Sequence, residues 1–239
     1  MFYAVISHNI DFVTFLMNEY NIEIDLRYCE WFHNLESFLV YFDRTNNFNK
    51  CFLFSTRFKI PSLSEYFLSH GANINEKDEY GCTVLHYAAE NYSKEIVEFI
   101  LSHGANINEK GKNGKIALHY ATENCSKEIA EILLSHGANI NEKDNSGHTA
   151  LFIAAMYNYK LIAKLLLSYG ANINEKDNDG KIALHHAAEN NSKETVEVLL
   201  SHGANINEID NDGYTALYYA RKNNNKETVE VLLSHGAKE

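Results

Sequence analysis

The sequence is poor in cysteine, proline and tryptophan, with four, one and one of them among its 239 residues. A disulfide framework or a zinc ribbon needs cysteines in close pairs, whereas no Cys-x-x-Cys occurs here. We therefore expect free thiols and a cytoplasmic protein. The four residues concerned are Cys29, Cys51, Cys82 and Cys125.

Positive charge is also scarce, because the net charge is −11 and no lysine-rich or arginine-rich stretch is present. Proteins that hold nucleic acid need a basic surface for the phosphates, so we expect no nucleic-acid partner. Residues 1–20 have an apolar helical rhythm, but polar residues interrupt it, and both a basic start and a small-residue cleavage site are missing. This pattern predicts neither a signal peptide nor a membrane span, and hence no membrane partner.

Motifs for catalysis are missing as well. No serine or cysteine stands in a nucleophile elbow, and no glycine-rich loop precedes a Lys-Ser or Lys-Thr pair. No pair of carboxylates occurs in a recognisable catalytic motif. We therefore expect a protein that is not an enzyme and that uses no cofactor.

The chain does contain one repeated segment, Ser-His-Gly-Ala-Asn-Ile-Asn-Glu. Four copies are unchanged, Tyr169 replaces the histidine in a fifth, and the sixth is cut short by the end of the sequence. The glycines recur every 33 residues, and a fixed period of this length indicates a solenoid of units that stack on their neighbours. These glycines are Gly71, Gly104, Gly137, Gly170, Gly203 and Gly236.

Each 33-residue unit has the same expected parts, as the copy that starts at Asp78 illustrates. An Asp-x-x-Gly segment predicts a tight turn at the tip of a hairpin, called the finger below. Residues 83–89 predict a short helix with small residues for close packing. Residues 94–101, after a capping Ser93, predict a second helix with an apolar stripe.

Residues 83–89 read Thr-Val-Leu-His-Tyr-Ala-Ala, which resembles the Thr-Pro-Leu-His-x-Ala-Ala motif of ankyrin repeats. The resemblance extends over about residues 62–239. It implies an all-α solenoid, an ankyrin repeat array of helix pairs with short β-hairpin fingers and a divergent helical N-terminal cap. The five full repeats, numbered first to fifth, start at Asp78, Gly111, Asp144, Asp177 and Asp210.

Residues 1–60 are rich in aromatic side chains and lack clean repeats. Leu35, Phe38, Leu39 and Phe42 have the spacing of one apolar helical face, and two further helices, in a hairpin, are expected between Ala4 and Met17. The segment is similar to the helical leader of ankyrin proteins from some protists. We expect residues 1–60 to form a divergent ankyrin-like cap. Residues 61–239 are expected to form the array, with a partial repeat ahead of the five full ones.

The array departs from the motif at the start of its first helices. The threonine that caps this helix in the first, third and fifth repeats is Ile116 in the second and Ile182 in the fourth. Loss of a capping hydroxyl costs about 1 kcal/mol. On this argument we expect Ile116→Thr and Ile182→Thr to raise the unfolding midpoint.

Twelve histidines raise the question of a metal site. The resemblance implies that His86, His119 and His185 tie each repeat to the neighbouring loop. Equivalent positions of stacked repeats lie about 10 Å apart, too far for one ion to bridge. We therefore expect no metal site.

The five copies differ mainly in the finger and at the end of the first helix. In ankyrin repeat proteins these positions line the concave face, so the resemblance implies that an unidentified protein partner binds there. The third repeat is the most apolar, with His148, Met156 and Tyr157, and it is the expected anchor because aromatic and methionine side chains are enriched at interfaces. Drift at unconstrained positions is the alternative explanation. The candidate protein-binding residues are Glu79, Tyr80, Glu90, Lys112, Asn113, Lys115, Glu123, Asn145, His148, Met156, Tyr157, Asn178, Asp179, Lys181, Glu189, Asp212, Tyr214 and Lys222.

A second hypothesis is a structural, self-associating module. The last helix, expected at residues 227–233, has no polar closing unit after it, so Val229 and Leu232 are expected to expose an apolar flank. Two chains would then pair weakly through their C-terminal repeats.

Overall fold

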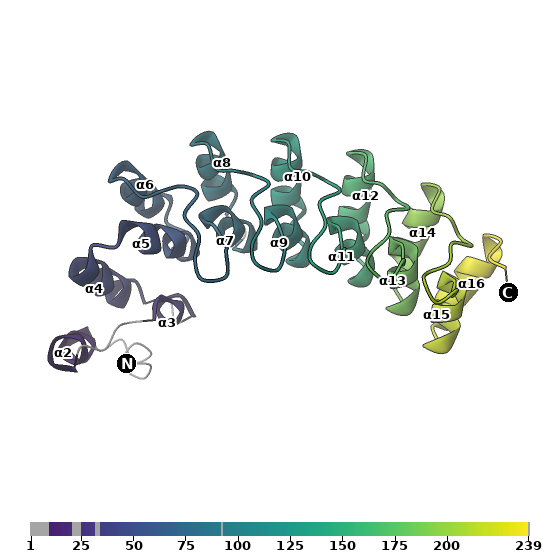
Figure 1. The fold of residues 1–239 in the computed structure, drawn as a ribbon, viewed down its shortest axis with the longest axis horizontal. Coiled ribbons are helices and arrows are strands. Elements are labelled where there is room, and N and C mark those ends of the chain that lie inside the picture. Colours follow the sequence, from purple (N-terminus) through teal and green to yellow (C-terminus); the bar gives the residue numbers. More distant parts are fainter. Residues whose placement is uncertain (1–9, 21–24, 32–33, 92, 239) are drawn as a thin grey trace. The chain divides into compact units, whose positions relative to one another are not determined.

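The chain is all-helical where the structure describes it, without β-strands, and it contains two compact units, residues 1–106 and 107–239 (Figure 1). In those described parts, no helix combines the length and the apolar character that crossing a bilayer requires. The predicted domain boundary after residue 60 lies inside the first unit and stays a prediction. The structure describes residues 10–20, 25–31, 34–91 and 93–238 in this computed structural model.

The first unit consists of short helices with polar caps. The Asn34 side chain accepts from the Ser37 N–H at the start of α4, and Asn47 does the same for Lys50 at the start of α5. Pro61 is the first residue of α6, where its missing N–H costs no hydrogen bond. A 3₁₀ turn, Thr56–Phe58, follows α5. The helices are α2 (Ile10–Tyr20), α3 (Leu26–Trp31), α4 (Leu35–Thr45), α5 (Phe48–Ser55), α6 (Pro61–Ser69), α7 (Val84–Glu90) and α8 (Lys94–Ser102).

Aromatic rings form the core of this unit, as the composition predicts. Phe38 and Phe67 are fully buried, with their ring centroids 5.9 Å apart in an edge-to-face arrangement. Phe42 meets Phe67 edge to face at 5.0 Å. The predicted apolar face of α4 is less complete than expected, because Leu39 is 43% exposed. Of the two helices expected between Ala4 and Met17, the second is confirmed by α2, and the first lies outside the described residues.

The second unit is a stack of helix pairs. In each pair a seven-residue inner helix is followed by a nine-residue outer helix. Inner helices pack on the next inner helix and outer helices on the next outer helix, so the same contacts recur along the unit. The inner helices are α9 (Ala117–Glu123), α11 (Ala150–Met156), α13 (Ala183–Glu189) and α15 (Ala216–Lys222), and the outer helices are α10 (Lys127–Ser135), α12 (Lys160–Ser168), α14 (Lys193–Ser201) and α16 (Lys226–Ser234).

The repeated Asn-Ile-Asn segment joins one repeat to the next. The backbone N–H of Asn139 donates to Oδ1 of Asn108, in the preceding repeat, at 2.7 Å. The Asn139 side chain accepts in turn from the Asn141 N–H and donates to Glu142. The bond between repeats recurs, with distances of 2.9 and 3.0 Å, from Asn172 to Asn141 and from Asn205 to Asn174.

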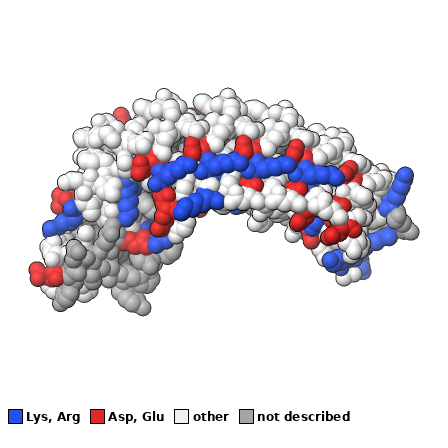
Figure 2. Space-filling model, in the orientation of Figure 1, with Lys and Arg blue, Asp and Glu red and all other residues white. Residues whose placement is uncertain are grey.

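The glutamate and lysine that follow this segment make a second connection. Lys143 Nζ lies 2.6 Å from Glu175 Oε1 in the next repeat and donates to the Lys176 carbonyl at 2.8 Å. Equivalent lysine–glutamate pairs recur along the unit, and Figure 2 shows Lys or Arg side chains in a row with Asp or Glu side chains beside it. The hydrogen bond from Lys143 lowers the pKa of Glu175 below its ordinary value. The other two pairs in the second unit are Lys110 with Glu142 and Lys176 with Glu208.

The fingers are hydrogen-bonded turns rather than the expected β-hairpins. In the third repeat the Asp144 N–H donates to the His148 carbonyl, and Gly147 has φ +82°. A Cβ there would lie 2.8 Å from the Asn178 nitrogen of the next finger, so only glycine fits. The described residues contain no strand beside these turns and only one isolated bridge, between Ile209 and Thr215. Neighbouring fingers are joined instead by backbone bonds such as Asn145 to Asn113 at 3.0 Å.

The inner helices start where the motif predicts, immediately after Ile116 in the second repeat and Ile182 in the fourth. Both isoleucine side chains are nevertheless fully buried. The imidazole Nδ1 atoms of His119 and His185 accept hydrogen bonds from the backbone N–H groups of these isoleucines. The capping position is therefore occupied by a core side chain.

Candidate functional site

The candidate residues of the second unit lie on the fingers and near the C-terminal ends of the inner helices. Each is at least partly accessible to solvent. Those half-buried are Lys115, Glu123, His148, Met156, Lys181 and Glu189. Those exposed are Lys112, Asn113, Asn145, Tyr157, Asn178, Asp179, Asp212, Tyr214 and Lys222.

An ion pair joins the finger to the inner helix in the second and fourth repeats. Lys115 pairs with Glu123, and Lys181 pairs with Glu189 at 3.1 Å. In the third repeat the same two positions hold His148 and Met156, which cannot form such a pair. At these two positions the third repeat therefore lacks the ion pair that both neighbouring repeats have.

A hollow of about 430 Å³ lies beside His148 and Met156, the two residues that replace the ion pair. Ile153 and Met156 of α11 contribute apolar surface, and Tyr157, 58% exposed, stands beside them. The Tyr157 ring stacks on Tyr159 with the centroids 5.6 Å apart. The hollow brings together seven of the candidate residues, namely Asn113, Lys115, Glu123, Asn145, His148, Met156 and Tyr157.

The candidate residues of the first unit are in two places. Glu79 and Tyr80 line a separate hollow of about 720 Å³. There the Arg27 guanidinium donates to the Tyr80 hydroxyl at 3.1 Å and pairs with Asp25 at 2.6 Å. Sequence reasoning missed Asp25 and Arg27, because the divergent leader gives no repeat position by which to place them.

The third candidate of the first unit, Glu90, stands apart from that hollow. It pairs with Arg57 at 3.2 Å. The Arg57 guanidinium carbon also lies 4.2 Å from the centroid of the Tyr87 ring. Burial lowers the pKa of Arg57, and the negative charge of Glu90 opposes this shift.

The fifth repeat carries an aromatic pair. The rings of Tyr214 and Tyr218 stack with their centroids 3.9 Å apart, and the Lys222 ammonium lies 5.9 Å from the Tyr218 centroid.

The last helix does not expose the apolar flank expected from Val229 and Leu232. Leu232 is fully buried and Val229 is half-buried, whereas Leu233, which was not expected, is 41% exposed.

Two histidines have the role that the motif implies. His119 Nε2 donates to the His148 carbonyl at 3.1 Å. His185 Nε2 lies 3.0 and 3.2 Å from the carbonyl oxygens of Glu208 and Tyr214. Burial lowers the pKa of both imidazoles, so the neutral form that makes these bonds is favoured. The inner helices α9 and α13 are thereby tied to the loop of the next repeat.

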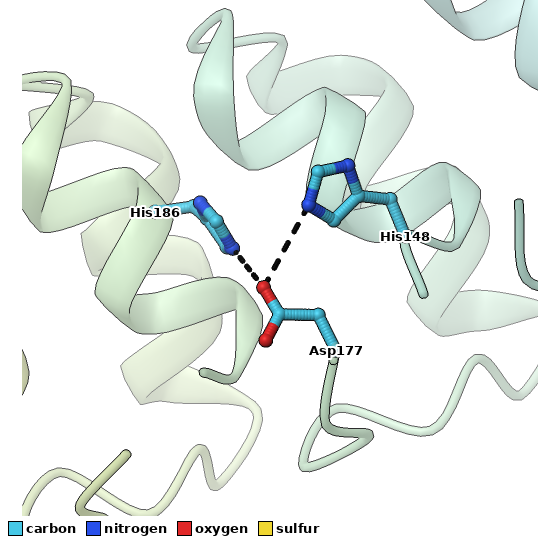
Figure 3. A group of neighbouring side chains, drawn as sticks. All are labelled: His148, Asp177 and His186. Atoms are coloured by element: carbon cyan, nitrogen blue, oxygen red, sulfur yellow. Dashed lines mark hydrogen bonds and ion pairs between the residues drawn. The ribbon is translucent and has the colours of Figure 1, made fainter. Parts of the chain in front are cut away.

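A further group of side chains meets where the third and fourth repeats adjoin. His148 and His186 both point toward one carboxylate oxygen of Asp177 (Figure 3). Burial opposes ionisation of this carboxyl, but the two imidazoles and the Lys181 N–H outweigh it and hold the pKa of Asp177 well below its ordinary value. The expectation that no ion could be bridged considered equivalent positions only, whereas these three positions are not equivalent.

Comparison with known proteins gives two matches. A family model described as ankyrin repeats (3 copies) matches residues 52–144, 107–177 and 151–239. A second, described as a domain of unknown function (DUF3447), matches residues 1–41. No curated protein matches the chain.

Proposed function

Because this chain belongs to the ankyrin repeat family, whose repeats generally serve as protein–protein interaction modules, we propose that it is a non-enzymatic scaffold that binds a partner protein. The proposed binding surface consists of the fingers and the adjoining ends of the inner helices. Free thiols at all four cysteines support placing the protein in the cytoplasm. Burial raises the pKa of Cys29 and of Cys51 to about 12, so both thiols stay protonated.

The hollow of the third repeat is the observation that carries the proposal. Met156 and Tyr157 supply accessible apolar surface there, and such side chains dominate the centres of protein interfaces. The Lys115–Glu123 ion pair of the second repeat lines the hollow and resembles the polar rim of an interface. An apolar side chain of the partner would enter this hollow beside that pair.

The fingers that border the hollow are rigidly connected. The Asn145 side chain donates to the Lys112 carbonyl, and Asn178 donates to the Asn145 carbonyl one repeat further on. Docking on a surface that is already ordered loses little conformational entropy. A typical interface of about 1,600 Å² would extend over three or four such repeats.

The test is partner capture by crosslinking in native lysate, followed by affinity measurement with the protein identified. We expect Met156→Ala with Tyr157→Ala to weaken binding about tenfold or more, because hot-spot side chains contribute at least about 2 kcal/mol. The matched control is Leu161→Ala with Tyr169→Ala, which removes comparable exposed side chains from the outer-helix side of the same repeat. Equal capture by both variants would exclude this anchor.

Light scattering at increasing protein concentration tests the self-associating alternative. We expect the mass of a monomer throughout, because Leu232, one of the two residues on which that alternative depended, is in the core. A mass that rises with concentration and falls on Leu233→Lys would favour self-association instead.

A further inference from the structure

Three potential metal ligands converge between the third and fourth repeats. His186 Nε2 lies 2.7 Å from Asp177 Oδ2, and His148 Nε2 lies 3.7 Å from the same oxygen. The three ligand atoms all lie within 4.8 Å of one another. Figure 3 shows that they come from three different segments, the finger of the third repeat, the finger of the fourth repeat and α13.

We propose that His148, Asp177 and His186 form a binding site for a divalent transition-metal ion, with Zn²⁺ the best fit. Imidazole nitrogen and carboxylate oxygen are both zinc ligands, with bond lengths of about 2.0–2.2 Å. Tetrahedral coordination at those lengths separates ligand atoms by about 3.3 Å. The observed separations of 2.7 and 3.7 Å lie on either side of that value, so small side-chain rotations admit the ion.

The carboxylate is held in the orientation that such a site needs. Asp177 Oδ1 accepts hydrogen bonds from the backbone N–H groups of Asp179 and Lys181, both at 2.9 Å. Oδ2 is thereby directed at the two imidazoles. Hydrogen bonds that orient a ligand from behind are typical of protein metal sites.

The imidazoles are also held in place. The ring of Phe152 lies 5.8 Å from that of His148 and 5.4 Å from that of His186, centroid to centroid. The Asp177 and His186 side chains are only 2% and 10% exposed, whereas His148 is 24% exposed. An ion can therefore enter past His148, and the fourth position of a tetrahedral site is left for water.

The other repeats show what this carboxylate does without imidazoles. Asp210, the equivalent residue of the fifth repeat, accepts from the Tyr219 hydroxyl at 2.5 Å, and Asp78 of the first repeat accepts from Tyr87. Those tyrosines occupy the position of His186. Lysine stands at the position of His148 in the second and fourth repeats. Two imidazoles on one carboxylate thus occur, among the described residues, at this junction alone.

Titration of the full chain with Zn²⁺ in a calorimeter, after treatment with a chelator, tests the site. We expect one Zn²⁺ per chain, and at least a tenfold loss of affinity in His186→Tyr and in His148→Lys. Each variant introduces the residue that other repeats have at the equivalent position. Each should therefore keep the helical circular dichroism and the cooperative unfolding of the wild type. Replacing Zn²⁺ by Co²⁺ gives a visible spectrum that reports coordination number, and we expect four ligands.

The matched control is His136→Gln, which removes an exposed histidine from the end of an outer helix and should leave Zn²⁺ affinity unchanged. Zn²⁺ should also raise the melting temperature of the wild type, since a ligand of the native state stabilises it. That rise should be absent in His186→Tyr. No uptake of Zn²⁺ by the wild type, or a Zn²⁺ affinity in His148→Lys and His186→Tyr equal to that of the wild type, would overturn the proposal. The result does not depend on whether a protein partner binds.

Discussion

The third repeat differs from its two neighbours where the finger meets the inner helix and at the start of that helix, but it shares their bonds between repeats. The second and fourth repeats close the gap between finger and inner helix with an ion pair, while the third holds His148 and Met156 there. The second and fourth also begin the inner helix after a buried isoleucine, and the third begins it after Thr149. All three share the bonds between Asn-Ile-Asn segments and between lysine and glutamate.

The comparison separates what a repeat needs to stack from what it presents to solvent. The bonds between these repeats depend on the Asn-Ile-Asn-Glu segments and on the lysines that follow them, which lie outside the fingers, so a repeat can change its finger without losing its connections. The third repeat uses that freedom to expose apolar surface at Met156 and Tyr157, and to direct His148 at Asp177 of the next repeat. Both proposals for this protein depend on the presence of His148 and Met156 in the third repeat, where the neighbouring repeats have lysine and glutamate.

The largest effect we expect tests whether the stacking framework is equal across these repeats. Leu133, Leu166 and Leu199 occupy the same position in α10, α12 and α14, and all three are fully buried. Replacing any one with alanine should lower the free energy of unfolding by about 2–5 kcal/mol. Urea denaturation should give values that agree within about 1 kcal/mol, because each cavity has the same surroundings. One value far outside that range would show that the third repeat differs in its core as well.

An intermediate effect concerns the start of the inner helices. Ile116→Thr and Ile182→Thr should each lower the free energy of unfolding by about 1 kcal/mol, which reverses the expectation from capping alone. Both side chains are fully buried, and losing apolar volume in a packed site costs more than a new hydroxyl cap returns. Thermal unfolding measures the change, with Ile116→Val as the control for volume. A higher midpoint in both threonine variants would restore the capping argument.

Much of the fold could be predicted from the sequence, because the same pattern of apolar and turn residues recurs every 33 residues and predicts the same helices in each repeat. The helix starts and the roles of His119 and His185 are confirmed. The Asn-Ile-Asn bonds could not be predicted in the same way. They join residues 31 positions apart, such as Asn139 and Asn108. The repetition of these asparagines is visible in the sequence, but the residue that each one bonds is not.

The site was predictable only in part, for a related reason. Comparing copies finds positions that vary, which is how His148 was selected, but it passes over Asp177, because four of the five repeats have aspartate there. His186 was visible as a histidine where three of the other four copies have tyrosine and the third repeat has Ile153. What the sequence does not give is that a finger meets the inner helix of the following repeat, and this contact brings the three residues together. The binding role of the other candidate positions stays a prediction.

The smallest effect we expect comes from the lysine and glutamate bonds, which should be equally weak on both sides of the third repeat. Lys110→Met and Lys143→Met should each cost about 0.2–1 kcal/mol at neutral pH, the usual range for accessible ion pairs. Hydrogen bonds from these lysines lower the pKa of Glu142 and Glu175 below the ordinary 4.5. A carboxyl with a lowered pKa stabilises the folded state above its ordinary pKa, and this contribution disappears as the pH falls through the lowered value. The difference between wild type and either variant should therefore shrink as the pH falls below 4.5, as unfolding followed from pH 7 to pH 3 would reveal. A difference that stays constant over this range, or that is much larger for one lysine than for the other, would show that packing of the lysine side chain, rather than its charge, joins the repeats.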